Sequence, residues 1–331
     1  MVKRILITGI CGFLGHHVCE AIMKTTDWDI VGIDRLNYAS RGFDRLREIE
    51  AYNHKKVNLL TVDLTKRIGE GVLKEIGDVD YIFHLAASTH VQRSIENPEP
   101  FVYDNVLGTF YTLELARQLK NLKKMIYFGT DEELGDTPIG VVYKEDKTVN
   151  PKNPYAAGKQ AGASICNAYF HTYKLPIIRT RCMNIFAERQ DPEKYVPLCI
   201  KNILSGNITN VHVHPKTQRP GSRFWIHARN VADALLFLLD KGTNGEIYHI
   251  APLDELDNLE IGQKIASIIG KEFKYKLIDW HSDRPGHDAR YGLDGTKLRS
   301  LGWKMPLDFE SSFRKTIEWS IKKENLKWLG L

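Results

Sequence analysis

The sequence lacks the features that would tie it to a membrane, a disulfide scaffold or a nucleic acid. Its five cysteines show no C-x-x-C pair, so their spacing favours neither a disulfide framework nor a zinc site. No apolar run approaches the roughly 20 residues that a membrane-spanning helix needs. Long lysine or arginine tracts are also missing, and the formal net charge is only +5. We therefore expect a protein without a signal segment, located in a reducing cytoplasm, whose mild positive charge suits an anionic small ligand.

What the sequence does contain is an alternation of short apolar runs and amphipathic stretches. The chain has 331 residues, of which 43% are apolar, which is ample for a large core. The apolar runs cover residues 5–7, 30–33, 57–62, 81–83 and 125–128, and residues 13–25 have helical spacing. Nearly continuous apolar strands that alternate with helices are typical of a parallel sheet covered on both faces. The sequence therefore predicts an α/β fold with a Rossmann-type doubly wound parallel sheet.

The second half of the chain predicts a smaller, discontinuous α/β lobe. Proline, glycine, asparagine and histidine become more frequent from about residue 184 onwards. A helix over 230–239, capped by Asn230, and a strand over 245–250 are expected to rejoin the sheet. We assign residues 1–182 and about 224–250 to the sheet domain, and about 183–223 and 251–331 to the lobe. A last helix is expected over about 308–325.

Two long helices are predicted over residues 99–120 and 154–173. Both segments carry apolar residues at helical spacing. Because such helices can bury apolar faces against a second copy of the chain, we expect a homodimer in which they form the interface.

A glycine-rich turn follows the first predicted strand and opens the first predicted helix. Its sequence is Gly9-Ile10-Cys11-Gly12-Phe13-Leu14-Gly15. Glycines at this place let the backbone approach a pyrophosphate at a helix N-terminus. Asp34 ends the second strand, where a carboxylate binds the adenosine ribose of NAD and repels the 2′-phosphate of NADP. Arg35 follows at once and weakens that preference, while Asp63 and Leu64, after the third strand, are placed to contact the adenine.

Three polar residues follow the strand over 125–128, and a tyrosine and a lysine lie downstream at helical spacing. The residues are Thr130, Asp131, Glu132, Tyr155 and Lys159. A lysine one helical turn from a phenol can lower the pKa of the phenol, which favours redox chemistry at a carbinol. Neighbouring carboxyls with unequal pKa values can act as an acid and a base. Both can serve one substrate only if the chain bends after Thr130, and Gly129 and Gly135 make such a bend possible.

These motifs, together with others in the same order, resemble a known family. The further motifs are His84-Leu85-Ala86-Ala87, His90-Val91-Gln92-Arg93-Ser94-Ile95, Asn105-Val106-Leu107-Gly108-Thr109, Arg181-Cys182-Met183-Asn184, Pro192-Glu193-Lys194 and Arg284-Pro285-Gly286-His287-Asp288. Nearly the whole chain resembles the extended short-chain dehydrogenase/reductases, and within them the nucleotide-sugar 4,6-dehydratases of the dTDP-glucose type. The acidic pair after the fifth strand is the dehydratase pattern, whereas epimerases and decarboxylases usually carry serine or threonine there.

The resemblance implies a role for each of these catalytic candidates. Tyr155 would take the proton of the sugar 4-hydroxyl, with Lys159 and Thr130 assisting, while NAD⁺ accepts the C4 hydride. Glu132 would then remove the C5 proton and Asp131 would protonate the departing 6-hydroxyl. The hydride would return to C6, giving a 4-keto-6-deoxy sugar nucleotide. Leu85, Ala86 and Ala87 would line the cofactor site.

The resemblance also implies substrate contacts, and here the chain departs from the family pattern. The residues concerned are Ser88, His90, Asn184, Lys194, Arg223, Arg284 and His287. Ser88 stands where a glutamate is common, Leu134 where the pattern has a tyrosine and Gln92 where an aspartate is common. Residues 185–189 and 215–221 replace the usual Asn-Tyr-Gly-Pro and Gly-Asp-Gly segments. The nucleotide, dTDP, UDP, CDP or GDP, and the hexose therefore stay open.

Other functions remain compatible with the sequence. A nucleotide-sugar 4-epimerase or a UDP-glucuronate decarboxylase would use Tyr155, Lys159 and NAD but would leave Asp131 and Glu132 without a role. A 5,6-dehydratase that stops at the alkene is another alternative, and a non-catalytic NAD-sensing protein is a third. His212 and His214 alternate along a predicted strand, and without a third ligand nearby we expect a plain strand and no metal.

Overall fold

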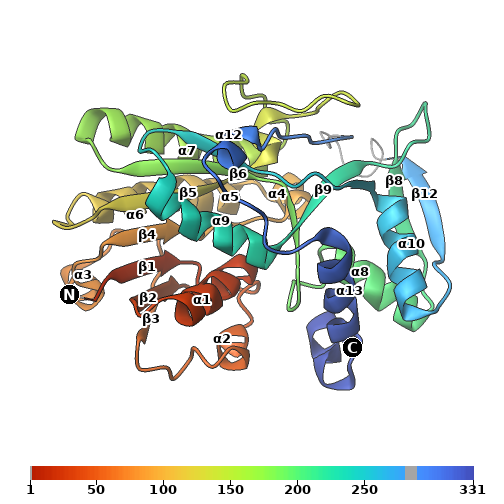
Figure 1. Cartoon of the computed structure of the whole chain (residues 1–331), viewed down its shortest axis with the longest axis horizontal. Helices are drawn as coiled ribbons and strands as arrows, with labels where there is room; N and C mark the ends of the chain where they lie inside the picture. Colours follow the sequence, from red (N-terminus) through yellow and green to blue (C-terminus); the bar gives the residue numbers. More distant parts are fainter. Residues whose placement is uncertain (1, 280–288) are drawn as a thin grey trace.

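The computed structural model describes residues 2–279 and 289–331 and contains a seven-stranded sheet whose neighbouring strands are all parallel. The strand order is β10-β6-β5-β4-β1-β2-β3. The strands span Arg4–Thr8 (β1), Asp29–Asp34 (β2), Val57–Thr61 (β3), Tyr81–His84 (β4), Lys124–Thr130 (β5), Ile177–Cys182 (β6) and Ile247–Ile250 (β10). The predicted Rossmann-type sheet is thus confirmed (Figure 1). The strand expected over 245–250 forms β10, which pairs with β6 at the edge of the sheet.

Helices cover both faces of this sheet because its strands are apolar on both sides. One core joins the sheet to α1 (Phe13–Thr25), α2 (Asp44–Glu48) and α9 (Ala228–Lys241). The other core joins it to α3 (Glu70–Ile76), α6 (Gly108–Ala116) and α7 (Pro154–Tyr173). The helix predicted over 154–173 therefore has the bounds that we expected.

The helix predicted over 99–120 is divided. It consists of α5 (Glu99–Val102), a π-helical turn η1 (Tyr103–Leu107) and α6, which ends at Ala116. The wider π turn places Asp104 and Asn105, which are adjacent in sequence, both in buried positions. Contacts of these two side chains with residues far away in the sequence, described below, account for a turn that the local apolar spacing did not predict.

Two further helix boundaries differ from the prediction. Asn230 does not cap α9, whose N-cap is His227. The buried Asn230 side chain instead bonds the backbone N–H and C=O of Leu307, at 2.9 and 2.8 Å. The last helix, α13 (Phe309–Ser320), is shorter than expected and is followed by the 3₁₀ segment η3 (Lys323–Leu329).

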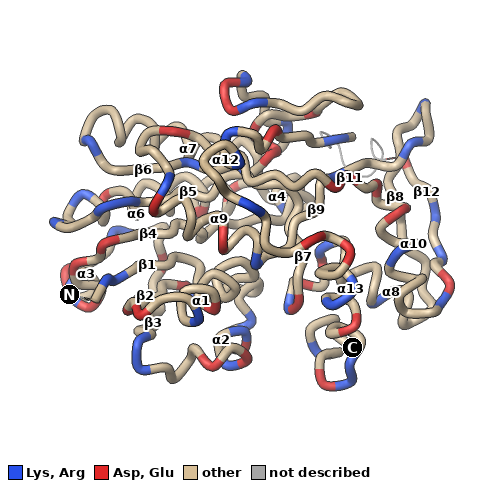
Figure 2. The backbone as a smooth tube through the Cα atoms, in the orientation of Figure 1, with Lys and Arg blue, Asp and Glu red and all other residues tan. Residues whose placement is uncertain are grey.

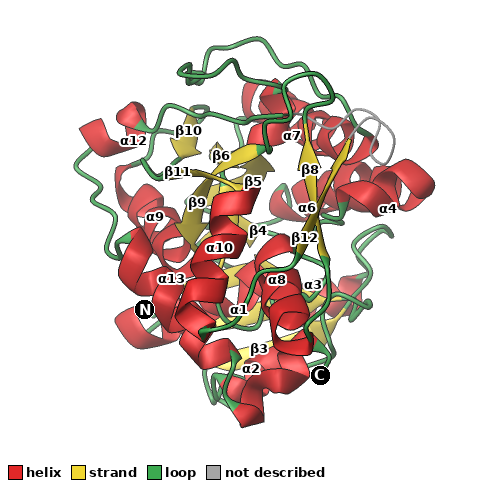
Figure 3. Ribbon diagram, turned by 90° about the vertical axis from the view of Figure 1, so that its right-hand side faces the viewer, coloured by secondary structure: helices red, strands yellow, loops and turns green. Residues whose placement is uncertain are grey.

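The remaining elements form a second lobe with its own apolar core. A three-stranded sheet has the order β11-β9-β7, and β12 pairs with β8. The strands are β7 (Asn184–Phe186), β8 (Thr209–Val213), β9 (Ser222–His227), β11 (Glu255–Asp257) and β12 (Tyr275–Asp279). Their core is completed by α8 (Tyr195–Ser205), α10 (Asn258–Ile269) and α13, which lie together in Figure 3. Outside this lobe, the short helix α4 (Val91–Glu96) contacts α7, and α12 (Thr296–Ser300) contacts β10.

Charge is spread over the molecule. Figure 2 shows acidic and basic residues interspersed along the tube, in both lobes. Among the described residues, no helix combines the length and apolar character required to cross a membrane.

Candidate active site

The site is built where the parallel strands end, because the carboxyl ends of such strands lie at one edge of the sheet. The glycine turn follows β1, Asp34 ends β2, Leu85 follows β4 and Thr130 ends β5. Two neighbouring hollows open along this edge. Gly9, Gly12, Leu85 and Ala87 line both, which makes the glycine turn the wall between them.

The glycine positions of the turn have no room for a larger residue. Gly9 has a φ of +74°, and a Cβ atom there would lie 2.8 Å from the Cα atom of Ala86. At Gly15 a Cβ atom would lie 2.1 Å from the carbonyl oxygen of Gly9. No side chain among the described residues caps the first turn of α1, which begins after Gly12. The first turn of α1 therefore presents its backbone N–H groups at the helix N-terminus, the arrangement that binds a pyrophosphate.

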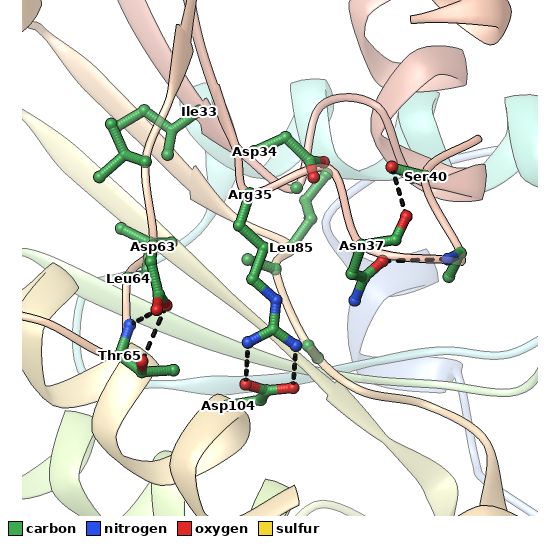
Figure 4. A pocket seen from close by; sticks show the side chains of 16 residues that line it. Ile33, Asp34, Arg35, Asn37, Ser40, Asp63, Leu64, Thr65, Leu85 and Asp104 are labelled. Atoms are coloured by element: carbon green, nitrogen blue, oxygen red, sulfur yellow. Dashed lines mark hydrogen bonds and ion pairs between the residues drawn. The ribbon is translucent and has the colours of Figure 1, made fainter. Parts of the chain in front are cut away.

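The first hollow holds the residues predicted to bind adenosine. Asp34, Asp63, Leu64 and Ala86 all line it (Figure 4). The Asp34 carboxylate accepts hydrogen bonds from the backbone N–H groups of Cys11 (3.1 Å) and Leu36 (2.9 Å). Burial raises the pKa of Asp34, and these two N–H donors oppose the rise. Hydrogen bonding thus holds the carboxylate at the mouth of the turn, where a ribose diol would meet it.

The second hollow is a cleft of about 310 Å³ that brings all five catalytic candidates together. Thr130, Asp131, Glu132, Tyr155 and Lys159 line it opposite the glycine turn. Phe13, Leu14 and Gly15, which are predicted to bind the cofactor, also line it. A dinucleotide on the turn would therefore reach the polar cluster from one side.

The bend expected after Thr130 is present. Strand β5 ends there, and the 3₁₀ helix η2 (Asp131–Leu134) begins at once and ends at Gly135, whose φ is +72°. The Thr130 hydroxyl donates a hydrogen bond to Asp131 Oδ1 (2.9 Å), and the backbone N–H of Glu132 donates to the same oxygen (3.1 Å). The bend thus turns two consecutive carboxyls into one cleft.

The two carboxyls have different surroundings. Burial and the charge of Glu132 raise the pKa of Asp131 to about 7, and its Oδ2 atom is buried with no hydrogen-bond partner in the described part of the chain. The Glu132 carboxylate accepts hydrogen bonds from the Asn153 side-chain amide (2.8 Å) and the Tyr291 hydroxyl (3.3 Å). Asp131 is therefore suited to donate a proton near neutral pH, and Glu132 to accept one.

Tyr155 and Lys159 occupy the first turns of α7, which the Asn153 side chain caps through a 2.9 Å bond from the Ala156 N–H. Both are buried. Burial lowers the pKa of Lys159 to about 8. Burial and then Glu132 raise the pKa of Tyr155 above its ordinary range, so the protein's own groups do not produce the lowered phenol pKa expected from the spacing. Desolvation of the phenol and the neighbouring carboxylates disfavour its charged form, and a positive charge in the cleft would favour the phenolate.

A buried ion pair behind the cleft was not predicted. Arg181 Nε lies 2.9 Å from Glu133 Oε2, and both side chains are almost completely buried. The other oxygen of Glu133 accepts a hydrogen bond from the Thr130 N–H (3.1 Å). The pair therefore fixes the start of η2 from behind. A third acid directly after Asp131-Glu132 was a signal for it in the sequence.

The predicted substrate residues divide into two groups. His90, Asn184 and Lys194 line the cleft. Ser88 and Arg223 line neither hollow: the Ser88 hydroxyl donates to Asp104 (2.5 Å), and Arg223 Nη1 donates to the carbonyls of Ser222 (2.7 Å) and Ala289 (2.9 Å). Ser88 is turned toward the adenosine side because Asp104 accepts its only hydroxyl proton. Arg284 and His287 lie outside the described residues.

Sequence reasoning also missed a buried cation at the cleft. Arg45, on α2, is 0% exposed and lines the cleft beside the glycine turn. Its guanidinium donates to the carbonyls of Cys11 (3.1 Å), Ala39 (2.7 Å) and Arg189 (2.9 Å). An arginine in a short charged helix gives no local signal of burial, so nothing in the sequence indicated this position.

No group of three or more histidine, cysteine or acidic side chains placed to hold a metal ion occurs within residues 2–279 and 289–331. His212 lies on β8 and His214 just beyond its end, so the predicted strand is present.

Comparisons with known proteins agree with this geometry. The family model described as GDP-mannose 4,6 dehydratase matches residues 6–316. A dTDP-glucose 4,6-dehydratase of Salmonella typhimurium is 34% identical over 99% of this chain and 94% of its own length. A crystal structure of a dTDP-glucose 4,6-dehydratase from Streptomyces venezuelae with NAD bound has a TM-score of 0.87 and 31% identity, with 98% of each chain covered.

A UDP-glucose 4-epimerase from Thermus thermophilus, in complex with NAD, is also similar, with a TM-score of 0.84 and 26% identity over 96% of this chain and 98% of its own. The fold of this chain is therefore similar to that of an epimerase as well as to that of a dehydratase. The match to the family model extends over both lobes, so the chain belongs to the GDP-mannose 4,6 dehydratase family, within the extended short-chain dehydrogenase/reductases that its motifs resemble.

Proposed function

We propose that this protein is an NAD-dependent nucleotide-sugar 4,6-dehydratase, a hydro-lyase that converts an NDP-hexose into an NDP-4-keto-6-deoxyhexose. The observation that carries the proposal is the single cleft in which Asp131 and Glu132, with unlike surroundings, face the same space as Thr130, Tyr155 and Lys159. An epimerase would need the tyrosine and lysine but would have no use for two adjacent carboxyls in unlike surroundings.

The residues at the sheet edge fit a bound NAD. The glycine turn admits a pyrophosphate because its glycines carry no Cβ atom that would obstruct it. Asp34 is placed to accept hydrogen bonds from the ribose diol, and Asp63 and Leu64 lie at the adenine end. Leu85 and Ala87 separate that end from the catalytic cleft. When bound, NAD would accept a hydride from C4 of the sugar and return it to C6.

The protein's own groups would move the protons. Tyr155 takes the 4-hydroxyl proton, Thr130 hydrogen-bonds the same oxygen and Lys159 places a positive charge beside them. Oxidation at C4 makes the C5–H bond acidic. Glu132 then accepts the C5 proton while Asp131 gives its proton to the 6-hydroxyl, which leaves as water. The return of hydride to C6 and of a proton to C5 completes the product, with no net change in oxidation state.

The second lobe would hold the nucleotide. In this division residues 1–182 and about 224–250 bind NAD, and about 183–223 and 251–331 bind the nucleotide diphosphate. Asn184 and Lys194 at the cleft support that placement, as does His90, whose Nε2 lies 3.4 Å from Glu193. The chain would act as a homodimer in the cytoplasm, joined through α5–α6 and α7.

The experiment is incubation of the purified protein with dTDP-, UDP-, CDP- and GDP-hexoses, and with UDP-glucuronate, without added NADH, followed by mass spectrometry. Loss of one water from a panel member supports the dehydratase and identifies the nucleotide. An unchanged mass with a new stereoisomer on chromatography would identify a 4-epimerase instead, and loss of carbon dioxide from UDP-glucuronate would identify a decarboxylase. A panel in which no member changes contradicts the proposal and favours the NAD-sensing alternative.

A further inference from the structure

An arginine stands beside the ribose site, at a place where proteins that bind NADP often use one. Arg35 directly follows Asp34 and lines the adenosine hollow. A free guanidinium there would attract a 2′-phosphate and oppose the selectivity that Asp34 gives. The selectivity of the site therefore depends on what holds Arg35.

Arg35 is held by Asp104. Figure 4 shows its guanidinium directed at this carboxylate, with Nη1 2.6 Å from Oδ1 and Nη2 2.5 Å from Oδ2. Such a bidentate pair fixes the plane of the guanidinium as well as its position. The side chain of Asp104 is only 7% exposed, so releasing Arg35 would leave a buried carboxylate without its cation, which is costly.

Asp104 is itself fixed from two sides. The π turn η1 directs it inward, and the hydroxyl of Ser88, just after β4, donates to its Oδ2 atom (2.5 Å). Ser88 is fixed in turn by Asn105, which accepts a hydrogen bond from the Ser88 N–H (2.9 Å) and donates one to its carbonyl (3.1 Å). Ser88, in the loop after β4, and Asp104 and Asn105, on η1, thus hold Arg35 together, and we call these three residues the clamp.

We propose that Asp104 is a specificity-determining residue of the dinucleotide site, which excludes NADP by holding Arg35 away from the adenosine ribose. This inference rests on the proposed binding of NAD. With Arg35 clamped, the hollow presents the carboxylates of Asp34, Asp63 and Asp104 against one cation that is already paired. A 2′-phosphate entering this space would meet unopposed negative charge.

The test is titration of the purified full chain and its variants with NADH and NADPH, followed by cofactor fluorescence. In Asp104→Asn the amide keeps the shape of the carboxyl but not its charge, so Arg35 is released. We expect affinity for NADPH relative to NADH to rise about tenfold, because a free guanidinium adds a charge-assisted contact to the 2′-phosphate. Ser88→Ala, which removes one support of the clamp, should shift the ratio in the same direction by about threefold.

Two further variants separate selectivity from structural support. Adding Arg35→Gln to Asp104→Asn should return the ratio to that of the native chain, because the gain acts through Arg35. Glu255→Gln breaks another bidentate pair, with Arg290 at 2.6 and 2.8 Å, and should lower thermal stability without changing the ratio. An unchanged ratio in both Asp104→Asn and Ser88→Ala overturns the inference, and Ser88→Ala alone decides it if Asp104→Asn fails to fold. Native protein that binds neither dinucleotide would contradict the proposed function itself.

Discussion

At the residue scale, the proposed chemistry depends on the different surroundings of two adjacent carboxyls. Asp131 has one oxygen bonded to its own neighbours and one buried oxygen for which the described chain offers no partner. Glu132 receives hydrogen bonds from Asn153 and Tyr291, which come from different parts of the chain. A proton is therefore retained on Asp131 into the neutral range, while Glu132, which accepts two hydrogen bonds, is the proposed proton acceptor.

Replacing each carboxyl should separate the two proton transfers. Asp131→Asn and Glu132→Gln should each lower the rate of water loss by about 100-fold or more, since each removes one general acid or base. In D₂O, Asp131→Asn should still exchange the C5 proton, because Glu132 remains, whereas Glu132→Gln should not. Mass spectrometry of recovered substrate and product measures both. Exchange in Glu132→Gln at the native rate would show that another group is the base. Asp240→Asn, on an exposed helix end, serves as the control.

The raised pKa of Asp131 also predicts a dependence of stability on pH. The folded-state pKa of about 7 exceeds the ordinary value of 3.8, so between these values the folded protein binds more protons than the unfolded chain. Stability contributed by this group is therefore present at low pH and is lost as pH rises through 7. Asp131→Asn, which stays neutral, should raise the melting temperature relative to the native chain more at pH 9 than at pH 5. An equal difference at both values would contradict the assigned pKa.

At the element scale, the turn after β5 is supported by the ion pair between Glu133 and Arg181. Glu133 reaches back to the Thr130 N–H while its other oxygen meets Arg181 on β6, so the 3₁₀ turn is fixed to the neighbouring strand. Gly129 leaves the space for this, because a Cβ atom there would lie 2.5 Å from Glu133 Oε1. The position of the two carboxyls proposed to be catalytic thus depends on a side chain that points away from the cleft.

Glu133→Gln should therefore lower stability and turnover together. Breaking a buried ion pair leaves Arg181 uncompensated, and we expect the free energy of unfolding to fall by about 3 kcal/mol. Because Glu133 positions the carboxyls without touching the substrate, kcat should fall while KM for the sugar nucleotide stays nearly constant. Asp44→Asn removes an exposed pair with Arg47 and should cost about 0.5 kcal/mol or less, without a kinetic effect. A normal kcat in a folded Glu133→Gln protein would rule out the positioning role.

Elements whose boundaries are encoded locally could be predicted from the sequence. The helix over 154–173 has an asparagine cap, Asn153, and a proline in its first turn, and its predicted bounds are confirmed. The π turn η1 and the start of α9 could not be predicted, because Asp104 bonds Arg35 and Asn230 bonds Leu307, residues that are 69 and 77 positions away.

The same distinction holds at the site. The glycine turn and the catalytic residues belong to short motifs, and the structure brings them to one edge of the sheet. Arg45 and Glu133 are buried charges whose compensation comes from backbone carbonyls and an arginine distant in sequence. Such partners depend on the folded arrangement, so composition and spacing alone did not place Arg45 at the cleft or pair Glu133 with Arg181 behind it.

At the scale of the whole molecule, the C-terminal segment connects the second lobe to the glycine turn. Arg41, after β2, donates to the Lys327 carbonyl (2.9 Å), and Lys327 Nζ lies 2.5 Å from Glu48 of α2. The Trp328 ring lies 5.5 Å from the guanidinium of Arg45, which itself bonds the Cys11 carbonyl. Segment η3 therefore couples α2 and the floor of the cofactor site to the lobe that is proposed to hold the nucleotide.

The proposed dimer places its interface on the face of the sheet opposite to α2, where α5, η1 and α7 expose small, aliphatic and aromatic residues. These residues are Val102, Tyr103, Ala157, Ser164, Ala168 and Tyr173. Small exposed residues along α7 would let a second helix approach closely. The same helices carry Asp104 and Tyr155 on their inner faces, so an interface here would also stiffen the supports of both hollows.

Ser164→Arg should therefore convert a dimer into a monomer, because a charged side chain in a helix–helix contact would be buried without a partner. Light scattering measures the change in mass. Ser267→Arg makes the same replacement at an exposed position of α10 and should leave the mass unchanged. A native chain with a monomer mass at every concentration would contradict the dimer. A dimer that persists in Ser164→Arg would place the interface elsewhere. If dimerisation rigidifies the helices that carry Asp104 and Tyr155, the monomeric Ser164→Arg protein should also lose turnover. Its circular dichroism spectrum should show that the monomer stays folded.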